Sequence, residues 1–181
     1  MLTNIVSRIN NISIARIFFG VILIAASAQI VIPIKPVPIT LQTVAAILIG
    51  LLYKPKEALL SWFLYLACGA LGMPVFNNFG HGLERLFGAT AGYFVGMSLA
   101  SYFLSYVRYK HKAAMQKLSH IIMLVILAQI IIYGFGVFWL SNFIGAKQAI
   151  ITGCLVFIPS GIIKSLIISL IFQYIHNAKT D

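Results

Sequence analysis

The sequence predicts an all-α integral membrane protein, a six-transmembrane-helix bundle with its N- and C-termini in the cytoplasm. The composition is 61% hydrophobic and only 9% charged, and the mean hydropathy is +1.00. A soluble domain carries about 25% charged residues, so this chain has too few of them to cover its surface in water. Several apolar runs approach the ~20 residues that span a bilayer, which makes the lipid bilayer the expected surroundings.

The chain carries a large excess of basic residues, but their positions do not indicate a nucleic-acid partner. The net charge is +10, from 13 Lys and Arg against 3 Asp and Glu. In a soluble protein this balance would favour a nucleic-acid partner. Here the basic residues lie mostly between apolar runs and form no basic face, so we expect no nucleic-acid binding. Neither the histidines nor Cys68 and Cys154 have metal-ligand spacing, so we expect no metal and no cofactor.

Residues 1–181 are expected to form a single membrane domain. The expected spans are residues 13–32, 39–53, 56–71, 88–107, 119–140 and 148–175. Asn10, Asn11 and Ser13 are residue types that cap a helix, and they precede or open the first span. A cleaved signal peptide is the alternative, since residues 26–28 resemble a cleavage site. The apolar run continues to Pro33, so we favour a retained helix whose small residues admit a neighbouring helix.

The connections between spans carry most of the proline and polar residues. Residues 33–38 form a proline-rich turn, and Pro55 fits the first turn of the third span, where its missing N–H costs nothing. Residues 72–87 form the longest polar connection, and loops of this length are more often functional than mere tethers. Small residues recur along 88–107 and predict a closely packed helix.

The last apolar region is too long for one straight helix across the bilayer. Gln148 to Tyr174 are 27 residues. At about 1.5 Å per residue they would extend ~40 Å, against a ~30 Å hydrocarbon core. We therefore predict a helical region broken near Pro159, with a short segment over 148–157 and a helix from about Ser160 to Ile175.

The basic residues predict the orientation of the bundle. Alternate connections place nine on one side: Arg8, Arg16, Lys54, Lys56, Arg108, Lys110, Lys112, Lys117 and Lys179. The other side receives three: Lys35, Arg85 and Lys147. Cytoplasmic loops carry the excess of Lys and Arg, so the first side is the cytoplasmic one. Residues 33–38, residues 72–87 and the start of the last region are then expected at the outer face.

Lys164 is the residue that most clearly predicts a binding site. It lies inside an apolar stretch, where a charged side chain is costly and by default functional. If a helix begins near Ser160, its free N–H groups and its dipole add to the lysine, and together they suit a carboxylate. The alternative is a lysine that extends to the outer headgroups.

Each of the other candidate polar and aromatic residues has two alternative interpretations. The amides of Asn77 and Asn78 can donate and accept, as a cyclic urea or amide requires, whereas Arg85 either joins the site or forms a solvated pair with Glu84. Thr40 and Gln42 either cap the second span or point into a cavity.

Tyr93 and Tyr133 either line an apolar pocket or belong to an interfacial belt. No phosphate-binding G-x-x-x-x-G-K-[ST] motif, H-E-x-x-H motif or pair of carboxylates within a span occurs, so we expect no enzyme.

Ordered blocks of the chain carry a family resemblance. They are Pro33-x-x-Pro36-Val37-Pro38-Ile39-Thr40-x-Gln42-Thr43, Tyr65-Leu66-x-x-Gly69-x-x-Gly72-x-Pro74-Val75-Phe76, Gly88-x-Thr90-x-Gly92-Tyr93-x-x-Gly96, Gly136-Val137-x-Trp139-Leu140 and Phe157-x-Pro159-x-x-x-x-Lys164. On these blocks the chain resembles the BioY family of biotin transporters. The resemblance implies a six-helix protein of the bacterial inner membrane that binds biotin near the outer face. It also implies a transmembrane coupling subunit and two cytoplasmic ATPase subunits as partners.

The resemblance suggests a role for each candidate site residue. The biotin carboxylate would meet Lys164 and the helix start near Ser160, together with Arg85. The ring would lie against Phe76 and Tyr93, and Asn77 or Asn78 would pair with the ureido group. The chain departs from the family pattern at Gly161, where an acidic residue is common, and at Ala89 and Ala91. A different small carboxylate vitamin, an integral-membrane enzyme and a purely structural subunit are the alternative functions.

Overall fold

The computed structural model describes the backbone of residues 2–177 and the side chains of residues 13–113 and 115–175. Lys179 and the side chains of Arg8, Asn10 and Asn11, which enter the predictions above, lie outside the described residues. The elements are α1 (Leu2–Gln29), β1 (Val31–Ile32), β2 (Ile39–Thr40), α2 (Gln42–Leu52), α3 (Pro55–Ala70), η1 (Asn77–Phe79), α4 (Leu83–Leu86), α5 (Ala91–Lys110), η2 (Lys112–Met115), α6 (Leu118–Ile144), α7 (Ala146–Gly153), η3 (Leu155–Phe157) and α8 (Ile158–Asn177).

Helix α5 lies at the centre of a helical bundle. It packs against α6, α2 and α3, while α1 packs against α3 and α2, and α8 packs against α6. The small residues that predict close packing lie on this central helix. A Cβ atom on Gly92 would lie 2.3 Å from the carbonyl oxygen of Phe135, and one on Gly96 would lie 2.8 Å from the Cα atom of Ile132. The α5–α6 contact therefore requires glycine at both positions.

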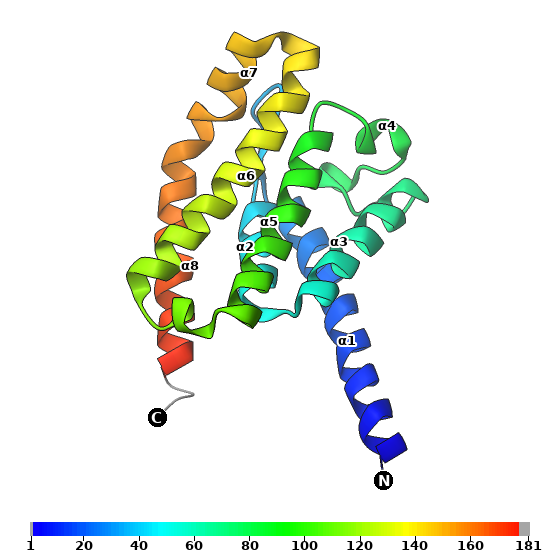
Figure 1. The fold of residues 1–181 in the computed structure, drawn as a ribbon. Coiled ribbons are helices and arrows are strands. Elements are labelled where there is room, and N and C mark those ends of the chain that lie inside the picture. The colour runs from blue at the N-terminus through cyan, green and yellow to red at the C-terminus, as the bar shows by residue number, and fades with distance from the viewer. Residues whose placement is uncertain (1, 178–181) are drawn as a thin grey trace.

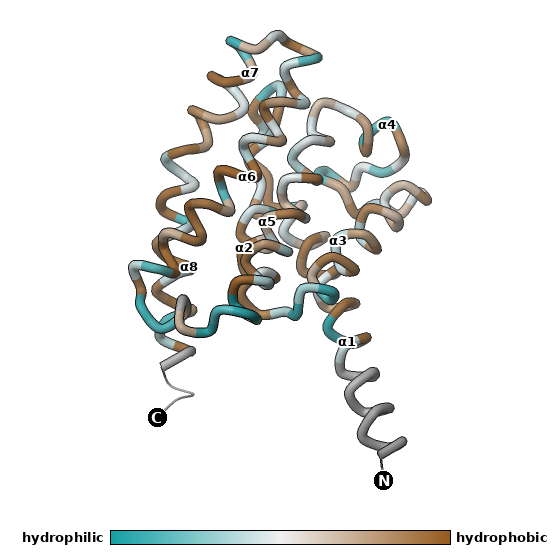
Figure 2. Tube along the Cα trace, in the orientation of Figure 1, coloured by the Kyte–Doolittle hydropathy of each residue, from teal (hydrophilic) through white to brown (hydrophobic). Residues whose placement is uncertain are grey.

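Polar connections gather at the two ends of the bundle. Figure 1 shows the β1–β2 turn, α4 and α7 at one end, whereas α1 begins, α8 ends and the α5–α6 connection turns at the other. Figure 2 shows hydrophobic residues along the helices and a hydrophilic stretch at the α5–α6 connection. The three segments predicted to share the outer face thus lie at one end of the molecule.

The helix surfaces are apolar in a way that suits lipid rather than water. Within the described residues, two helical segments are long and apolar enough to cross a membrane, Leu118–Ile144 and Ala146–Ile175. Ser13–Gln29 and Gln42–Leu52 are shorter apolar helices. Large apolar side chains project from them, including Phe138 with 74% of its surface exposed and Ile163 with 59%. Exposed apolar residues of this size along whole helices mark a membrane-facing surface. The count of six spans remains a prediction.

The break in the last helical region lies earlier than predicted. Helix α7 ends at Gly153, Cys154 leaves helical geometry with φ −129° and ψ −61°, and a 3₁₀ turn leads into α8. Pro159 lies in the first turn of α8 rather than at the break. Proline is tolerated there because the first N–H groups of a helix have no partner within it. Pro159 therefore marks a helix start, and α8 begins at Ile158, two residues before the start predicted at Ser160.

The chain is mostly helical, as expected, and a short β-ribbon closes the proline-rich turn. Val31 pairs with Thr40 and Ile32 with Ile39 in antiparallel register. The expected second span begins at residue 39, but residues 39 and 40 form a strand and α2 begins at Gln42. Residues 35–37 bend and reverse the chain, so the segments on both sides can meet as antiparallel strands.

Ser13 does not cap the first helix, which begins at Leu2. Its Oγ donates a hydrogen bond to Oε1 of Glu57, at 2.7 Å. The buried Glu57 carboxylate also accepts from the backbone N–H of Lys54 at 3.0 Å and lies 3.7 Å from Arg16. This carboxylate thereby joins α1 to the start of α3 at the end of the bundle opposite α7.

Candidate functional site

A polar-edged cavity opens where the β-ribbon, α2, α5, α6 and α8 converge. It encloses about 40 Å³ and is partly open to the surface, well below the ~300 Å³ at which small-molecule sites usually begin. Its lining residues are Val37, Pro38, Thr40, Gln42, Thr43, Asn77, Thr90, Tyr93, Phe94, Met97, Ile132, Tyr133, Phe157, Ser160 and Lys164.

Lys164 contributes an uncompensated positive charge to this cavity. The side chain is half-buried, and its Nζ donates a hydrogen bond to the carbonyl oxygen of Thr40 at 3.2 Å. Within the described residues the single ion pair is Arg16–Glu57, so no carboxylate neutralises Lys164. The bond to Thr40 directs the lysine into the protein rather than to lipid headgroups. A partly buried charge without a counter-charge favours binding of an anion.

Ser160 lies one turn before Lys164 on α8 and also lines the cavity. Its Oγ donates to the carbonyl oxygen of Phe157 at 3.0 Å. The hydroxyl proton is therefore used within the helix start, and the oxygen keeps lone pairs that can accept a hydrogen bond. Because α8 begins at Ile158, Lys164 lies in the second turn of the helix, further from the terminal N–H groups than predicted.

Asn77 brings an unsatisfied amide to the same cavity. The residue is buried, with 9% of its surface exposed. No hydrogen bond of its side-chain amide occurs among the described residues, and neither amide atom is among the fully buried unpaired ones, so the amide is open to the cavity. Its backbone carbonyl accepts from the N–H of Gly80 at 3.2 Å. A buried amide normally pairs both its donor and its acceptor. The Asn77 amide is therefore free to pair with a ligand that offers both a hydrogen-bond donor and an acceptor.

Thr40 and Gln42 combine the two roles that the sequence leaves open. The backbone N–H of Gln42, the first residue of α2, donates to Oγ1 of Thr40 at 3.3 Å, although the N-cap residue is Leu41 and makes no side-chain capping bond. The Gln42 side chain donates to the hydroxyl of Tyr65 at 2.9 Å, and that hydroxyl donates to the carbonyl oxygen of Val75 at 3.3 Å. Both residues also line the cavity. This chain of bonds fixes the β-ribbon and the 72–87 connection beside each other.

Aromatic side chains form the apolar wall. The hydroxyl of Tyr93 donates to the carbonyl oxygen of Gly153 at 2.7 Å, which ties α5 to the break between α7 and α8. The ring of Phe157 lies 6.2 Å from that of Tyr93 and 6.1 Å from that of Tyr133. Tyr93 is only 6% exposed and therefore belongs to the pocket rather than to an interfacial belt.

Three residues predicted for the site do not line the cavity. Asn78 is exposed, and its φ of 54° turns the backbone away after Asn77. Arg85 is exposed on the short helix α4. Phe76 is fully buried behind the wall, where its ring stacks on Phe94 at 5.4 Å. Six of the predicted residues therefore line the cavity, and Asn78, Arg85 and Phe76 lie outside its lining. The six are Lys164, Ser160, Asn77, Tyr93, Gln42 and Thr40.

Sequence reasoning did not identify several wall residues. They are Val37, Pro38, Thr90, Phe94, Met97, Ile132 and Phe157. Helical spacing could have suggested Met97, which lies four residues after Tyr93 on the same helix face. Val37, Pro38, Thr90 and Phe157 lie within the ordered blocks quoted above, whereas no spacing singles out Phe94 or Ile132.

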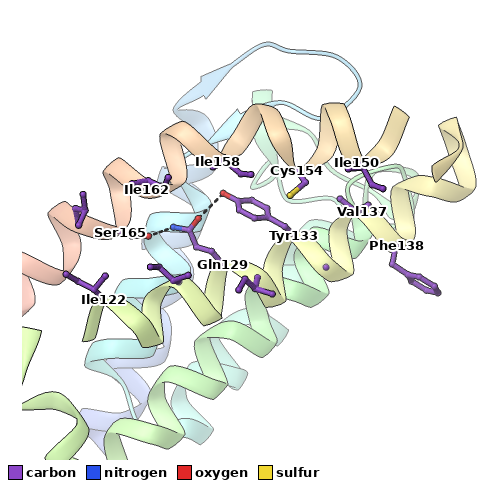
Figure 3. A pocket seen from close by; sticks show the side chains of 14 residues that line it. Ile122, Gln129, Tyr133, Val137, Phe138, Ile150, Cys154, Ile158, Ile162 and Ser165 are labelled. Atoms are coloured by element: carbon purple, nitrogen blue, oxygen red, sulfur yellow. Dashed lines mark hydrogen bonds between the residues drawn. The ribbon is translucent and has the colours of Figure 1, made fainter. Parts of the chain in front are cut away.

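A larger apolar groove lies between α6 and the α7–α8 region (Figure 3). Its lining residues are Ile122, Ile126, Gln129, Ile130, Tyr133, Gly134, Val137, Phe138, Ile150, Cys154, Ile158, Ile162, Ser165 and Leu166. No charged side chain is among them. This groove suits acyl chains, whereas the cavity with Lys164 and Asn77 suits a polar solute.

The fold defines a helical membrane protein, and the cavity with Lys164 at one end of its bundle suits a small anionic molecule. The sequence matches the BioY family over residues 3–181. The chain belongs to the BioY family.

Named relatives agree with this assignment. A "probable biotin transporter BioY" of Rickettsia prowazekii is 39% identical over 168 residues, covering 93% of this chain and 85% of the relative. One from Pyrococcus horikoshii is 34% identical over 158 residues, covering 87% of this chain and 91% of the relative. These relatives are named as transporters, in accord with the expectation that the chain is not an enzyme.

A solved structure shares the fold. The crystal structure of an S-component for biotin from an ECF-type ABC transporter matches with a TM-score of 0.79 and 26% sequence identity, over 98% of this chain and 95% of that chain. The chain is therefore a membrane protein with the fold of such a transporter component.

Proposed function

We propose that this chain is the substrate-binding membrane subunit for biotin uptake, which captures biotin at the outer face of the bacterial inner membrane. The observation that carries the proposal is the uncompensated Lys164 in the same cavity as the unpartnered amide of Asn77. Biotin carries one carboxylate and one cyclic urea, so it offers an anion to the first and a donor–acceptor pair to the second.

The two polar residues suggest how biotin lies in the cavity. The carboxylate accepts a hydrogen bond from Nζ of Lys164, and the ureido group pairs with Asn77. The apolar rings rest against Tyr93 and Phe157. Lysine has three donors, and Thr40 accepts one of them, which leaves two for the carboxylate.

The energy for uptake would come from outside this chain. The sequence contains no phosphate-binding G-x-x-x-x-G-K-[ST] motif. We therefore propose a transmembrane coupling subunit and two cytoplasmic ATPase subunits as partners. Six spans formed by a single domain, with both termini cytoplasmic, complete the proposal, and the gathering of the β1–β2 turn, α4 and α7 at one end of the bundle supports it (Figure 1).

Calorimetric titration of the purified chain in detergent tests the proposed substrate. We expect biotin to bind, and its neutral amide, biotinamide, to bind at least tenfold more weakly because it lacks the charge that Lys164 requires. Lipoate, another small carboxylate vitamin, is the competitor without a urea. Tighter binding of lipoate than of biotin, or equal binding of biotin and biotinamide, would contradict the proposal.

A further inference from the structure

Gln129 crosses the gap between two helices with its amide fixed in one orientation. It lies on α6 and is buried, with 8% of its surface exposed. Its Nε2 donates to the carbonyl oxygen of Gly161 at 2.8 Å and to Oγ of Ser165, both on α8. A backbone carbonyl can only accept, so Nε2 must face α8. The oxygen Oε1 therefore faces Tyr133, as Figure 3 shows.

This orientation determines where the hydroxyl proton of Tyr133 points. The hydroxyl donates to Oε1 of Gln129 at 3.0 Å, and the carbonyl of Phe157 is a more distant acceptor at 3.5 Å. A hydroxyl has one proton and two lone pairs. With its proton engaged, the Tyr133 oxygen is an acceptor only, and no described residue donates to it. Tyr133 also lines the cavity that holds Lys164 and Asn77.

Gly161 makes room for this arrangement. A Cβ atom at this position would lie 2.3 Å from Oε1 of Gln129 and 2.7 Å from the Tyr133 hydroxyl oxygen. Neither atom could stay in place beside a larger residue. Glycine is therefore required at position 161, because Gln129 and Tyr133 occupy the space that a Cβ atom would need.

We propose that Tyr133 determines ligand specificity by accepting a hydrogen bond from a ring N–H of the ligand, and that Gln129 is the positioning residue that holds the hydroxyl in this state. The inference rests on the proposed function, because the cyclic urea of biotin carries two ring N–H groups. A ligand without such a donor leaves the desolvated hydroxyl oxygen unpaired, which disfavours its binding.

Two biotin analogues, each methylated on one ring nitrogen, separate this role from simple packing. We expect Tyr133→Phe to weaken biotin binding about three- to tenfold, the range of one neutral hydrogen bond. The same substitution should leave affinity unchanged for the analogue whose methyl group replaces the hydrogen that Tyr133 accepts. The measured quantity is the ratio of dissociation constants for biotin and each analogue, from calorimetry on the purified chain.

Substitutions that disturb the position of the Tyr133 hydroxyl should change the same ratio of dissociation constants. Gln129→Leu and Gly161→Ala both remove the fixed acceptor for the Tyr133 proton, so each should reduce the preference for biotin over that analogue as Tyr133→Phe does. Gly134→Ala is the matched control, since a Cβ atom there meets nothing within 4 Å. Thermal unfolding in detergent reports separately whether each variant remains folded.

The outcomes distinguish this inference from the proposed function. An unchanged ratio in Tyr133→Phe, or an equal loss of affinity for biotin and both analogues, overturns the role of Tyr133. An unchanged ratio in both Gln129→Leu and Gly161→Ala overturns the role of Gln129. Failure of the wild-type chain to bind biotin overturns the proposed function and this inference with it.

Discussion

Nζ of Lys164 lies 3.2 Å from the carbonyl oxygen of Thr40, a residue 124 positions earlier in the chain. This bond joins α8 to the β-ribbon and directs the ammonium group into the cavity. Because the carbonyl carries no net charge, the bond orients the lysine without neutralising it. We expect an anionic ligand to bind to the positive charge that Lys164 retains.

Lys164→Met should weaken biotin binding at least tenfold. A hydrogen bond to a charged group contributes about 1.5–3 kcal/mol, and methionine keeps the apolar stem while removing the charge. The variant should also lose the preference for biotin over biotinamide, which calorimetry with both ligands measures. Arg85→Gln is the control, because this second cation is exposed and outside the cavity. A tenfold loss in Arg85→Gln, or none in Lys164→Met, would contradict the placement of the anion site.

Asn77→Ala should reduce biotin affinity about three- to tenfold, as expected for loss of one neutral hydrogen bond. The melting temperature of the ligand-free protein should not fall, because the amide has no partner among the described residues. The neighbouring Asn78→Gly serves as the control, since Asn78 is exposed and glycine accepts its φ of 54°. If Asn78→Gly weakened binding as much as Asn77→Ala, the assignment of the amide would be wrong.

Cysteine labelling should place residue 35 outside and residue 112 inside the cell. Lys35→Cys and Lys112→Cys would each be made in a chain whose Cys68 and Cys154 are replaced by serine. Both lysines are exposed, on the β1–β2 turn and on η2. In intact cells a membrane-impermeant maleimide should react with the Lys35→Cys chain alone, and in inverted vesicles with the Lys112→Cys chain alone. The reverse pattern would invert the proposed orientation.

Glu57→Gln should destabilise the protein without changing biotin affinity. The Glu57 carboxylate is 4% exposed and accepts hydrogen bonds from Ser13 and from the backbone of Lys54. Loss of its charge weakens this network, at a cost of about 1–3 kcal/mol, so the melting temperature in detergent should fall by several degrees. Glu84→Gln is the matched control, because Glu84 is exposed on α4. Equal melting temperatures for the two variants would show that the network contributes little.

Local patterns predicted much of the helical architecture but misplaced its ends. Proline alone does not distinguish a break from a helix start, so Pro159 suggested the former whereas the break lies at Cys154. The ribbon from Val31 to Thr40 depends on pairing between two segments, which neither segment displays by itself. Ser13 has the chemistry of a cap, but Glu57 on another helix determines its bond.

Composition and ordered motifs are local properties of the chain, and they establish the membrane class, the positive charge of Lys164 and the membership of the family. Only the tertiary structure decided which polar groups share one cavity. It places Asn77, but neither Asn78 nor Arg85, in the cavity wall. It also pairs Gln129 with Tyr133 over Gly161, where an acidic residue is common in the family pattern. The physical reason is that hydrogen-bond partners are chosen by distance in space, and these groups meet only once helices far apart in the chain have packed together.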